Sequence, residues 1–273
     1  MPFQISKISD QGTANPIVAR LSVQTSEIIK FCPRGEEFHN SVLELFHDHV
    51  QKHLLECDQI AKEIAEEILD IDSESGKEGL KKQADGRVVE VPYVIRLTPR
   101  VEQFLYCAKS ALRDLARIFK LFFGKEFDSA RYDKVIEWAE KEFGSESELV
   151  KTLKQDQDSW IKKLISMRNA VEHPGGYSGH LYIHNVALVP PDHPNHPILE
   201  TPSMQLNDEE KEPIVEYLLT TVRNILEFCE DMLVICITME GLPKMIGFAE
   251  IPESERDPSC PIRLRAVLKG IKI

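Results

Sequence analysis

The stretch "RVEQFLYCAKSALRDLARIFKLFF" (Arg100–Phe123) carries the hydrophobic pattern that decides the fold class. Its apolar residues recur at alternating steps of four and three, the spacing of one face of an α-helix. This seam consists of Val101, Leu105, Ala108, Leu112, Leu115, Phe119 and Phe122. Phe104, Ala111 and Ile118 widen it. We therefore predict a single helix over residues 99–123 at the centre of a helical bundle.

The opposite side of this predicted helix carries a basic stripe. Because each residue of a helix is rotated by about 100° from the last, one set of residues gathers on the face away from the seam. The basic stripe consists of Lys109, Arg113, Arg117 and Lys120. Two interpretations are open, an ordinary solvated face or a track for RNA.

Four further segments show helical periodicity, which makes the fold mainly α. The expected helices cover residues 36–71, 129–143, 145–173 and 207–240. The first carries apolar residues from Phe46 to Ile71 at steps of three and four. Pro174 ends the third, because a proline removes a helical hydrogen bond and restricts the residue before it.

The segments between these helices predict small β additions. "PIVARLSVQ" (residues 16–24) suggests an extended opening, and residues 72–98 suggest a loop followed by one or two short strands. "HLYIHNVALVP" (residues 180–190) predicts a strand or hairpin arm, and the tail predicts irregular structure with short strands.

The expected organisation has three parts that pack as one compact domain. Residues 1–98 hold the extended segment, a long helix and the strand-containing connection. Residues 99–243 hold the helical core, with a loop or hairpin insertion near 175–205. Residues 244–273 form the irregular tail with strands. A chain of 273 residues is long enough to bury a substantial core.

The composition of the chain excludes some classes of protein. The hydrophobic content of 42% indicates a folded protein, and the net charge of −12 argues against nucleic-acid or anionic-membrane binding driven by total charge. The N-terminus lacks a signal-peptide pattern and no apolar run is long enough to span a membrane, so we expect a cytoplasmic protein. The six cysteines show no CxxC pair, and we expect reduced thiols.

"SMRNAVEHPGG" (residues 166–176) is the candidate site. Arg168 falls inside an apolar arc of its helix, where a guanidinium needs a partner or a cleft. Asn169 and His173 lie four residues apart and project from one side of the helix end. A structural interpretation needs no chemistry, because Arg168 can pair with Glu172 one turn later.

"RNAVEH" (residues 168–173) resembles the R-x4–6-H motif of the HEPN superfamily, in which a polar residue often follows the arginine. The resemblance covers the helices of residues 99–173 and extends to the last long helix. It implies an antiparallel helical bundle, a homodimer and metal-independent endoribonuclease activity. It also implies that Arg168 binds the scissile phosphate, that His173 is the general acid or base, and that Asn169 orients them.

The same spacing occurs a second time, in "RGEEFH" (residues 34–39). That copy opens a helix, contains Gly35 and two acidic residues, and follows no apolar helix. Context therefore favours residues 168–173.

Histidines outside the motif cluster twice, but neither cluster predicts a metal. His47, His49 and His53 lie on one helix, yet the glutamate of a zincin HExxH motif is missing and His53 falls in the apolar seam. His180, His184, His193 and His196 lie in the proline-rich connection without a second cluster at ligand spacing. Phosphate-loop, dinucleotide and nucleophile-turn motifs are also missing, so we expect no metal and no cofactor.

Two hypotheses of different classes remain. The first is a metal-independent RNase whose homodimer brings together two Arg168–His173 pairs, with RNA held on the basic stripe. The second is a non-catalytic interaction or ligand-sensing protein in which Arg168 and Glu172 form a structural ion pair. The first requires that His173 be open to solvent.

Overall fold

The structure is a computed structural model that describes residues 11–78, 91–189 and 199–269. Its residues group into two compact units. Unit 1 comprises Met1–Leu55, Ala108–Lys162 and Arg223–Ile273, and unit 2 comprises Glu56–Cys107 and Lys163–Val222.

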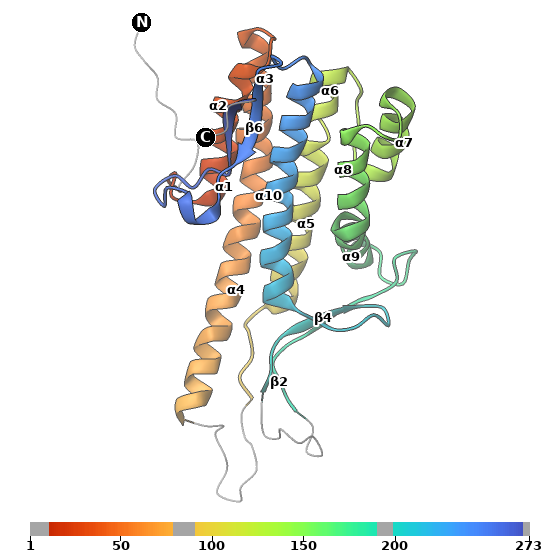
Figure 1. The fold of residues 1–273 in the computed structure, drawn as a ribbon. Helices are drawn as coiled ribbons and strands as arrows, with labels where there is room; N and C mark the ends of the chain where they lie inside the picture. The colour runs from red at the N-terminus through yellow and green to blue at the C-terminus, as the bar shows by residue number, and fades with distance from the viewer. Residues whose placement is uncertain (1–10, 79–90, 190–198, 270–273) are drawn as a thin grey trace, which may run out of the picture. The chain divides into compact units, whose positions relative to one another are not determined.

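Helices make up most of the described residues, which confirms the mainly α class (Figure 1). The α-helices are α1 (Pro16–Val18), α2 (Thr25–Ile28), α3 (Glu36–Glu44), α4 (Gln51–Glu78), α5 (Leu97–Leu115), α6 (Ile118–Phe123), α7 (Tyr132–Phe143), α8 (Glu148–Asp156), α9 (Lys162–Glu172) and α10 (Ile214–Met239). The π-helical turns are η1 (Ala19–Gln24), η3 (Leu45–Val50) and η4 (Gln157–Ile161), and the 3₁₀ turns are η2 (Ile29–Phe31) and η5 (Glu253–Glu255).

Short strands form small antiparallel sheets, as the sequence predicted. The strands are β1 (Leu181–His184), β2 (Ala187–Leu188), β3 (Leu199–Glu200), β4 (Ser203–Leu206), β5 (Glu212–Pro213), β6 (Ile246–Glu250) and β7 (Leu264–Leu268). Unit 2 holds the sheet of order β1-β4-β5 and the pair β2-β3. Unit 1 holds the hairpin-like pair β6-β7, which confirms the strands expected in the tail.

The opening segment is helical, and the extended conformation expected for residues 16–24 is wrong. The Oδ1 of Asn15 accepts a hydrogen bond from the backbone N–H of Ile17 at 2.8 Å, and Pro16 occupies the first helical position. Both features start helices. Ile17, Leu21 and Ile28 are buried at helical spacing, so tertiary burial outweighs the strand preference of the β-branched residues.

The connection before α5 also differs from the expectation. α4 continues to Glu78, residues 79–90 lie outside the described part, and residues 91–96 form no strand. Side chains satisfy this backbone instead. Asn185 exchanges two hydrogen bonds with the Val94 backbone, at 2.8 and 2.9 Å, and the Ile95 N–H donates to Glu67 at 2.7 Å. These bonds replace those that a neighbouring strand would supply.

The central seam is confirmed, although the helix that carries it is broken. All seven seam residues are buried, from Val101 to Phe122. The chain turns at Ala116 and Arg117, where the Arg117 N–H donates to the Asp114 carbonyl at 3.0 Å. The seam therefore runs through α5 and α6, and the single helix predicted over residues 99–123 is wrong at this point.

The other predicted helices exist with changed bounds. The helix expected at 129–143 is α7, and the one expected at 145–173 consists of α8, η4 and α9. The last helix begins at Ile214 rather than at residue 207, because Asn207 has a φ of 54° and Pro213 belongs to β5. Neither conformation continues a helix.

A buried carboxylate joins three distant segments of unit 1. Glu230 of α10 is 2% exposed, and its carboxylate accepts hydrogen bonds from Arg20 at 2.8 Å, Gln24 at 2.6 Å and Arg263 at 2.6 Å. The Gln24 Oε1 accepts the backbone N–H groups of Arg263 and Leu264 at 2.7 and 2.6 Å. Glu230 and Gln24 thus fix the opening helix, α10 and the tail together.

We predict that Glu230→Ala lowers the free energy of unfolding by about 3–5 kcal/mol, because it leaves the buried Arg20 guanidinium without its counter-charge and Arg263 with Asp231 in place of two carboxylates. Chemical denaturation monitored by circular dichroism measures this change. Glu142→Ala, at an exposed position of α7, is the control and should change the free energy by less than about 0.5 kcal/mol. Equal stability of the two variants would contradict a central role for Glu230.

Candidate functional site

Of the predicted catalytic residues, Arg168 and Asn169 lie in the last turns of α9 and His173 directly follows the helix, all in unit 2. Leu164, Met167 and Ala170 form the buried face of this helix. The His173 N–H donates to the Asn169 carbonyl at 2.8 Å, and the helix ends at Glu172, immediately before His173 and Pro174. The helix end expected from Pro174 is therefore confirmed to within a residue.

Arg168 is held by two partners. Its Nη1 donates to Glu172 Oε2 at 3.1 Å, and its guanidinium carbon lies 5.5 Å from the centre of the Tyr106 ring. The Arg168 side chain is only 14% exposed, whereas that of Glu172 is 42% exposed. The ion pair considered in the structural interpretation is thus present. Tyr106 comes from α5, and helix periodicity alone could not identify it.

His173 and Asn169 differ in exposure. His173 is exposed, and Asn169 is half-buried. The openness of His173 is what the enzymatic hypothesis requires. A tightly packed histidine would have excluded proton transfer to a substrate.

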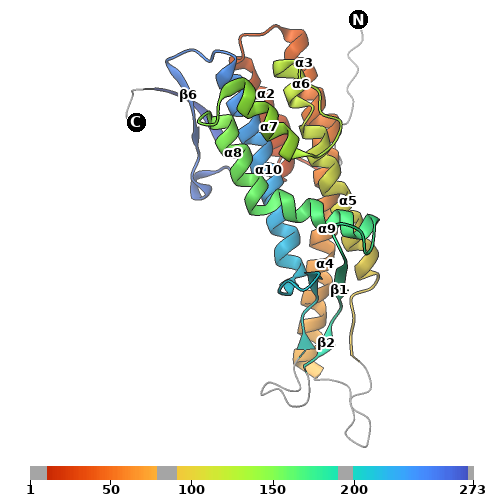
Figure 2. The same ribbon diagram turned by 90° about the vertical axis from the view of Figure 1, so that its right-hand side faces the viewer.

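A hydrogen-bonded turn follows His173 and leads from α9 into β1 (Figure 2). The N–H of Gly176 donates to the His173 carbonyl and the N–H of Gly175 to the Gly179 carbonyl, both at 2.9 Å. Gly175 and Gly179 have φ values of 75° and 77°, which favour glycine. At Gly179 a Cβ would also come within 1.8 Å of the Asn207 side-chain oxygen. The glycines predicted to form a loop therefore form one defined turn.

Asn207 secures this turn from the far side. Its Oδ1 accepts the His180 N–H at 2.8 Å, and its Nδ2 donates to the Ser178 carbonyl at 3.1 Å. On α9, Lys163 forms ion pairs with Glu209 at 3.4 Å and with Glu212. Asn207 thus fixes the turn after α9, and Lys163 ties the beginning of α9 to the β4–β5 connection within unit 2.

The basic stripe lies in unit 1, and carboxylates accompany part of it. Arg113 donates to Asp114 at 3.3 Å and Lys120 to Glu126 at 2.7 Å. Arg117 is exposed at the break between α5 and α6, and Lys109 is half-buried. The stripe is a partly neutralised surface rather than a row of free cations.

In the second copy of the motif (residues 34–39), the arginine and the histidine form structural contacts. Arg34 donates to the carbonyls of Leu121 and Phe122 at 3.0 and 2.8 Å and pairs with Glu240. The His39 Nε2 lies 3.2 Å from the Cys32 carbonyl oxygen. These bonds explain residues 34–39 without a reaction, as the sequence context suggested.

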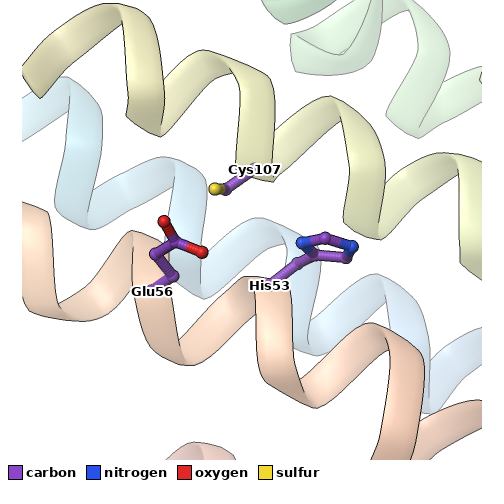
Figure 3. A group of neighbouring side chains, drawn as sticks. All are labelled: His53, Glu56 and Cys107. Carbon is purple, nitrogen blue, oxygen red and sulfur yellow. The ribbon is translucent and has the colours of Figure 1, made fainter. Parts of the chain in front are cut away.

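Of the first histidine cluster, His53 pairs with a carboxylate. His53 Nε2 lies 3.4 Å from Asp114 Oδ2, and Glu56 follows one turn later on α4 (Figure 3). Beside Glu56, the amide of Gln103 donates to Glu56 at 2.7 Å and to the Cys107 sulfur at 3.4 Å. An amide donor satisfies both groups without a cation. The six cysteines carry free thiols.

Of the second histidine group, His180 and His184 lie on or beside β1. His193 and His196 lie outside the described residues. A pocket of about 680 Å³ lies elsewhere in unit 2, around the ion pair of Glu67 and Arg100. It is lined by Glu56, Ile60, Glu67, Ile95, Arg96, Pro99, Arg100 and Gln103. The motif residues are not among these, and sequence periodicity gave no sign of the pocket.

His47 is half-buried in unit 1, and this partial burial lowers its pKa although the Ser22 backbone and Asp48 act in the opposite direction. Folding therefore favours the neutral imidazole. Its contribution to stability is present above the unfolded pKa of about 6.5 and is lost as the pH falls through the lower pKa of the folded state.

We predict that the free energy of unfolding falls between pH 7.5 and pH 5 and that His47→Gln removes part of this fall, because the variant has no imidazole to protonate. Urea unfolding at each pH measures the effect. Parallel pH profiles for the wild type and His47→Gln would show that His47 does not contribute to it.

The chain matches no protein-family model, and no similar protein was found among curated proteins or solved structures. Within the described residues, no helix is long and apolar enough to cross a membrane.

Proposed function

We propose that the chain is an HEPN-like, metal-independent endoribonuclease whose reaction is carried out by Arg168 and His173 with the help of Asn169. The observation that supports this most is the exposure of His173 at the end of α9, one turn beyond Arg168. Substrate can reach the imidazole there, and histidine is the side chain used most often for proton transfer.

Arg168 must exchange its present partner for the substrate. An ion pair between residues four apart on a helix is worth about 0.2–0.5 kcal/mol. A hydrogen bond to a charged group is worth about 1.5–3 kcal/mol, and the guanidinium fork matches two phosphate oxygens. A scissile phosphate can therefore displace Glu172, while stacking on Tyr106 keeps the guanidinium in place.

In the proposed reaction the ribose 2′-hydroxyl attacks the adjacent phosphorus, and the 5′-oxygen leaves. Arg168 stabilises the charge that develops on the non-bridging oxygens. His173 transfers a proton as general acid or base, and Asn169 orients the pair. The product ends would be a 2′,3′-cyclic phosphate and a 5′-hydroxyl.

Two further elements belong to this proposal. A homodimer would bring two copies of the Arg168–His173 pair together, as in the family that the motif resembles. Lys109, Arg113, Arg117 and Lys120 would attract RNA. Arg113, Arg117 and Lys120 are exposed, and Arg113 and Lys120 already pair with carboxylates, which makes Arg117 the strongest candidate among these three. A protein of net charge −12 needs such local positive charge.

We expect the purified protein to cleave mixed-sequence single-stranded RNA in EDTA and to leave 2′,3′-cyclic phosphate ends. Arg168→Ala and His173→Ala should each lower the cleavage rate about 100-fold or more, because each removes a group used in the transition state. Arg131→Ala and His49→Ala are the matched controls in unit 1. Cleavage that survives both motif substitutions would rule out this site.

A second candidate function is a non-catalytic interaction or ligand-sensing protein, and the Arg168–Glu172 ion pair favours it. In that case the pair is structural, and its low exposure on the arginine side reflects packing on Tyr106. The two candidates differ in what the pair contributes to stability.

A double-mutant cycle of Arg168→Ala and Glu172→Ala measures that contribution. If Glu172 is only a resting partner, we expect a coupling energy of about 0.2–0.5 kcal/mol and retained RNA cleavage in Glu172→Gln. A coupling energy above about 1 kcal/mol, without cleavage by the wild type, would favour the structural pair.

A further inference from the structure

The turn after α9 joins two histidines. In "HPGGYSGH" (residues 173–180) His173 precedes the turn and His180 follows it. The ring of His180 lies against Gly175, where a Cβ would come within 3.3 Å of its Nε2. Likewise, a Cβ built on Gly176 would lie 3.3 Å from the Cβ of His173. One tight turn therefore carries both imidazoles.

The distance between them is limited by this arrangement. Because Gly175 and Gly176 are consecutive, the Nε2 of His180 and the Cβ of His173 are at most roughly 13 Å apart. His173 is exposed, so its imidazole can change rotamer toward the turn that carries His180.

The His180 imidazole is both positioned and open. Its ring centre lies 6.1 Å from that of Tyr182, with an angle of 32° between the planes. Its backbone is fixed by Asn207, which accepts its N–H and donates from its own backbone to the His180 carbonyl at 2.9 Å. His180 is nevertheless exposed, so its ring is available to a substrate.

We propose that His180 is a second catalytic residue, which forms an acid–base pair with His173 inside one protomer. This inference rests on the proposed RNase function. The reaction needs one proton removed from the 2′-hydroxyl and one donated to the 5′-oxygen, and the inference assigns these two transfers to two different histidines. The neutral imidazole of one residue accepts the proton of the 2′-hydroxyl as the 2′-oxygen bonds to phosphorus. The imidazolium of the other donates a proton to the 5′-oxygen as its bond to phosphorus breaks.

The test uses RNA in which sulfur replaces the 5′-oxygen that leaves. A thiolate leaves without protonation, because thiols are far more acidic than alcohols. Cleavage of the sulfur-containing and ordinary RNA is measured for the full-length wild type, His173→Ala, His180→Ala and the control His49→Ala. His180→Asn, which keeps a polar side chain against Gly175, checks that the turn still folds, by thermal unfolding.

We expect His173→Ala and His180→Ala each to lose about 100-fold or more in the cleavage of ordinary RNA. One of the two, the variant without the general acid, should regain a rate near that of the wild type on the sulfur-containing RNA. His49→Ala should behave as the wild type on both.

Other outcomes separate this inference from the function on which it rests. Unchanged cleavage by His180→Ala, with loss in Arg168→Ala and His173→Ala, would overturn the histidine pair and keep the RNase. Loss in both histidine variants without recovery of either on the sulfur-containing RNA would also overturn the acid–base pair. Absence of cleavage by the wild type on both RNAs would overturn both proposals.

Discussion

The neutralisation of Glu230 is the constraint on which unit 1 depends. A carboxylate with 1% side-chain exposure would be very costly alone, and its partners come from positions 210 residues before it and 33 residues after it. Arg263 in turn also pairs with Asp231; burial lowers the pKa of Arg263, but the two carboxylates outweigh this and raise it. The charges are satisfied only when the opening helix, α10 and the tail meet.

The hydrogen-bonded network around Glu230 contributes more to the selection of one packing arrangement than to the net free energy of unfolding. Desolvation offsets much of the attraction between buried charges, whereas the loss of one member leaves the others uncompensated. Apolar seams can slide by a helical turn at small cost, but Arg20 and Arg263 can meet Glu230 in only one arrangement. The network therefore selects one packing among those that the apolar residues permit.

The sequence predicted what depends on local periodicity and missed what depends on distant partners. The buried face of α5 followed from spacing alone, because the seam from Val101 to Phe122 repeats without interruption. The break at Ala116 and Arg117 could not be predicted, because no glycine or proline lies there. The opening helix was misjudged because its β-branched residues resemble a strand, and the buried partners of Arg20 lie over two hundred residues away.

In the candidate site, too, local spacing predicted some features, whereas contacts between distant residues could not be predicted. The Arg168–Glu172 pair could be foreseen from a spacing of four, and Pro174 correctly placed the end of α9. The stacking of Arg168 on Tyr106 joins residues of two helices, so the hydrophobic pattern of neither helix predicts it. The turn could be anticipated as glycine-rich, but its shape depends on Asn207, whose oxygen occupies the space that a side chain at Gly179 would need.

This turn bears on the choice between a reaction site and a plain helix end. A left-handed backbone conformation favours glycine, because a residue with a Cβ is strained there. Here Gly175 and Gly179 take left-handed conformations and Gly176 approaches the His173 carbonyl, so three glycines serve one shape. That shape holds one exposed imidazole against Gly175 and begins directly at another. The turn therefore fixes where the backbone presents both imidazoles.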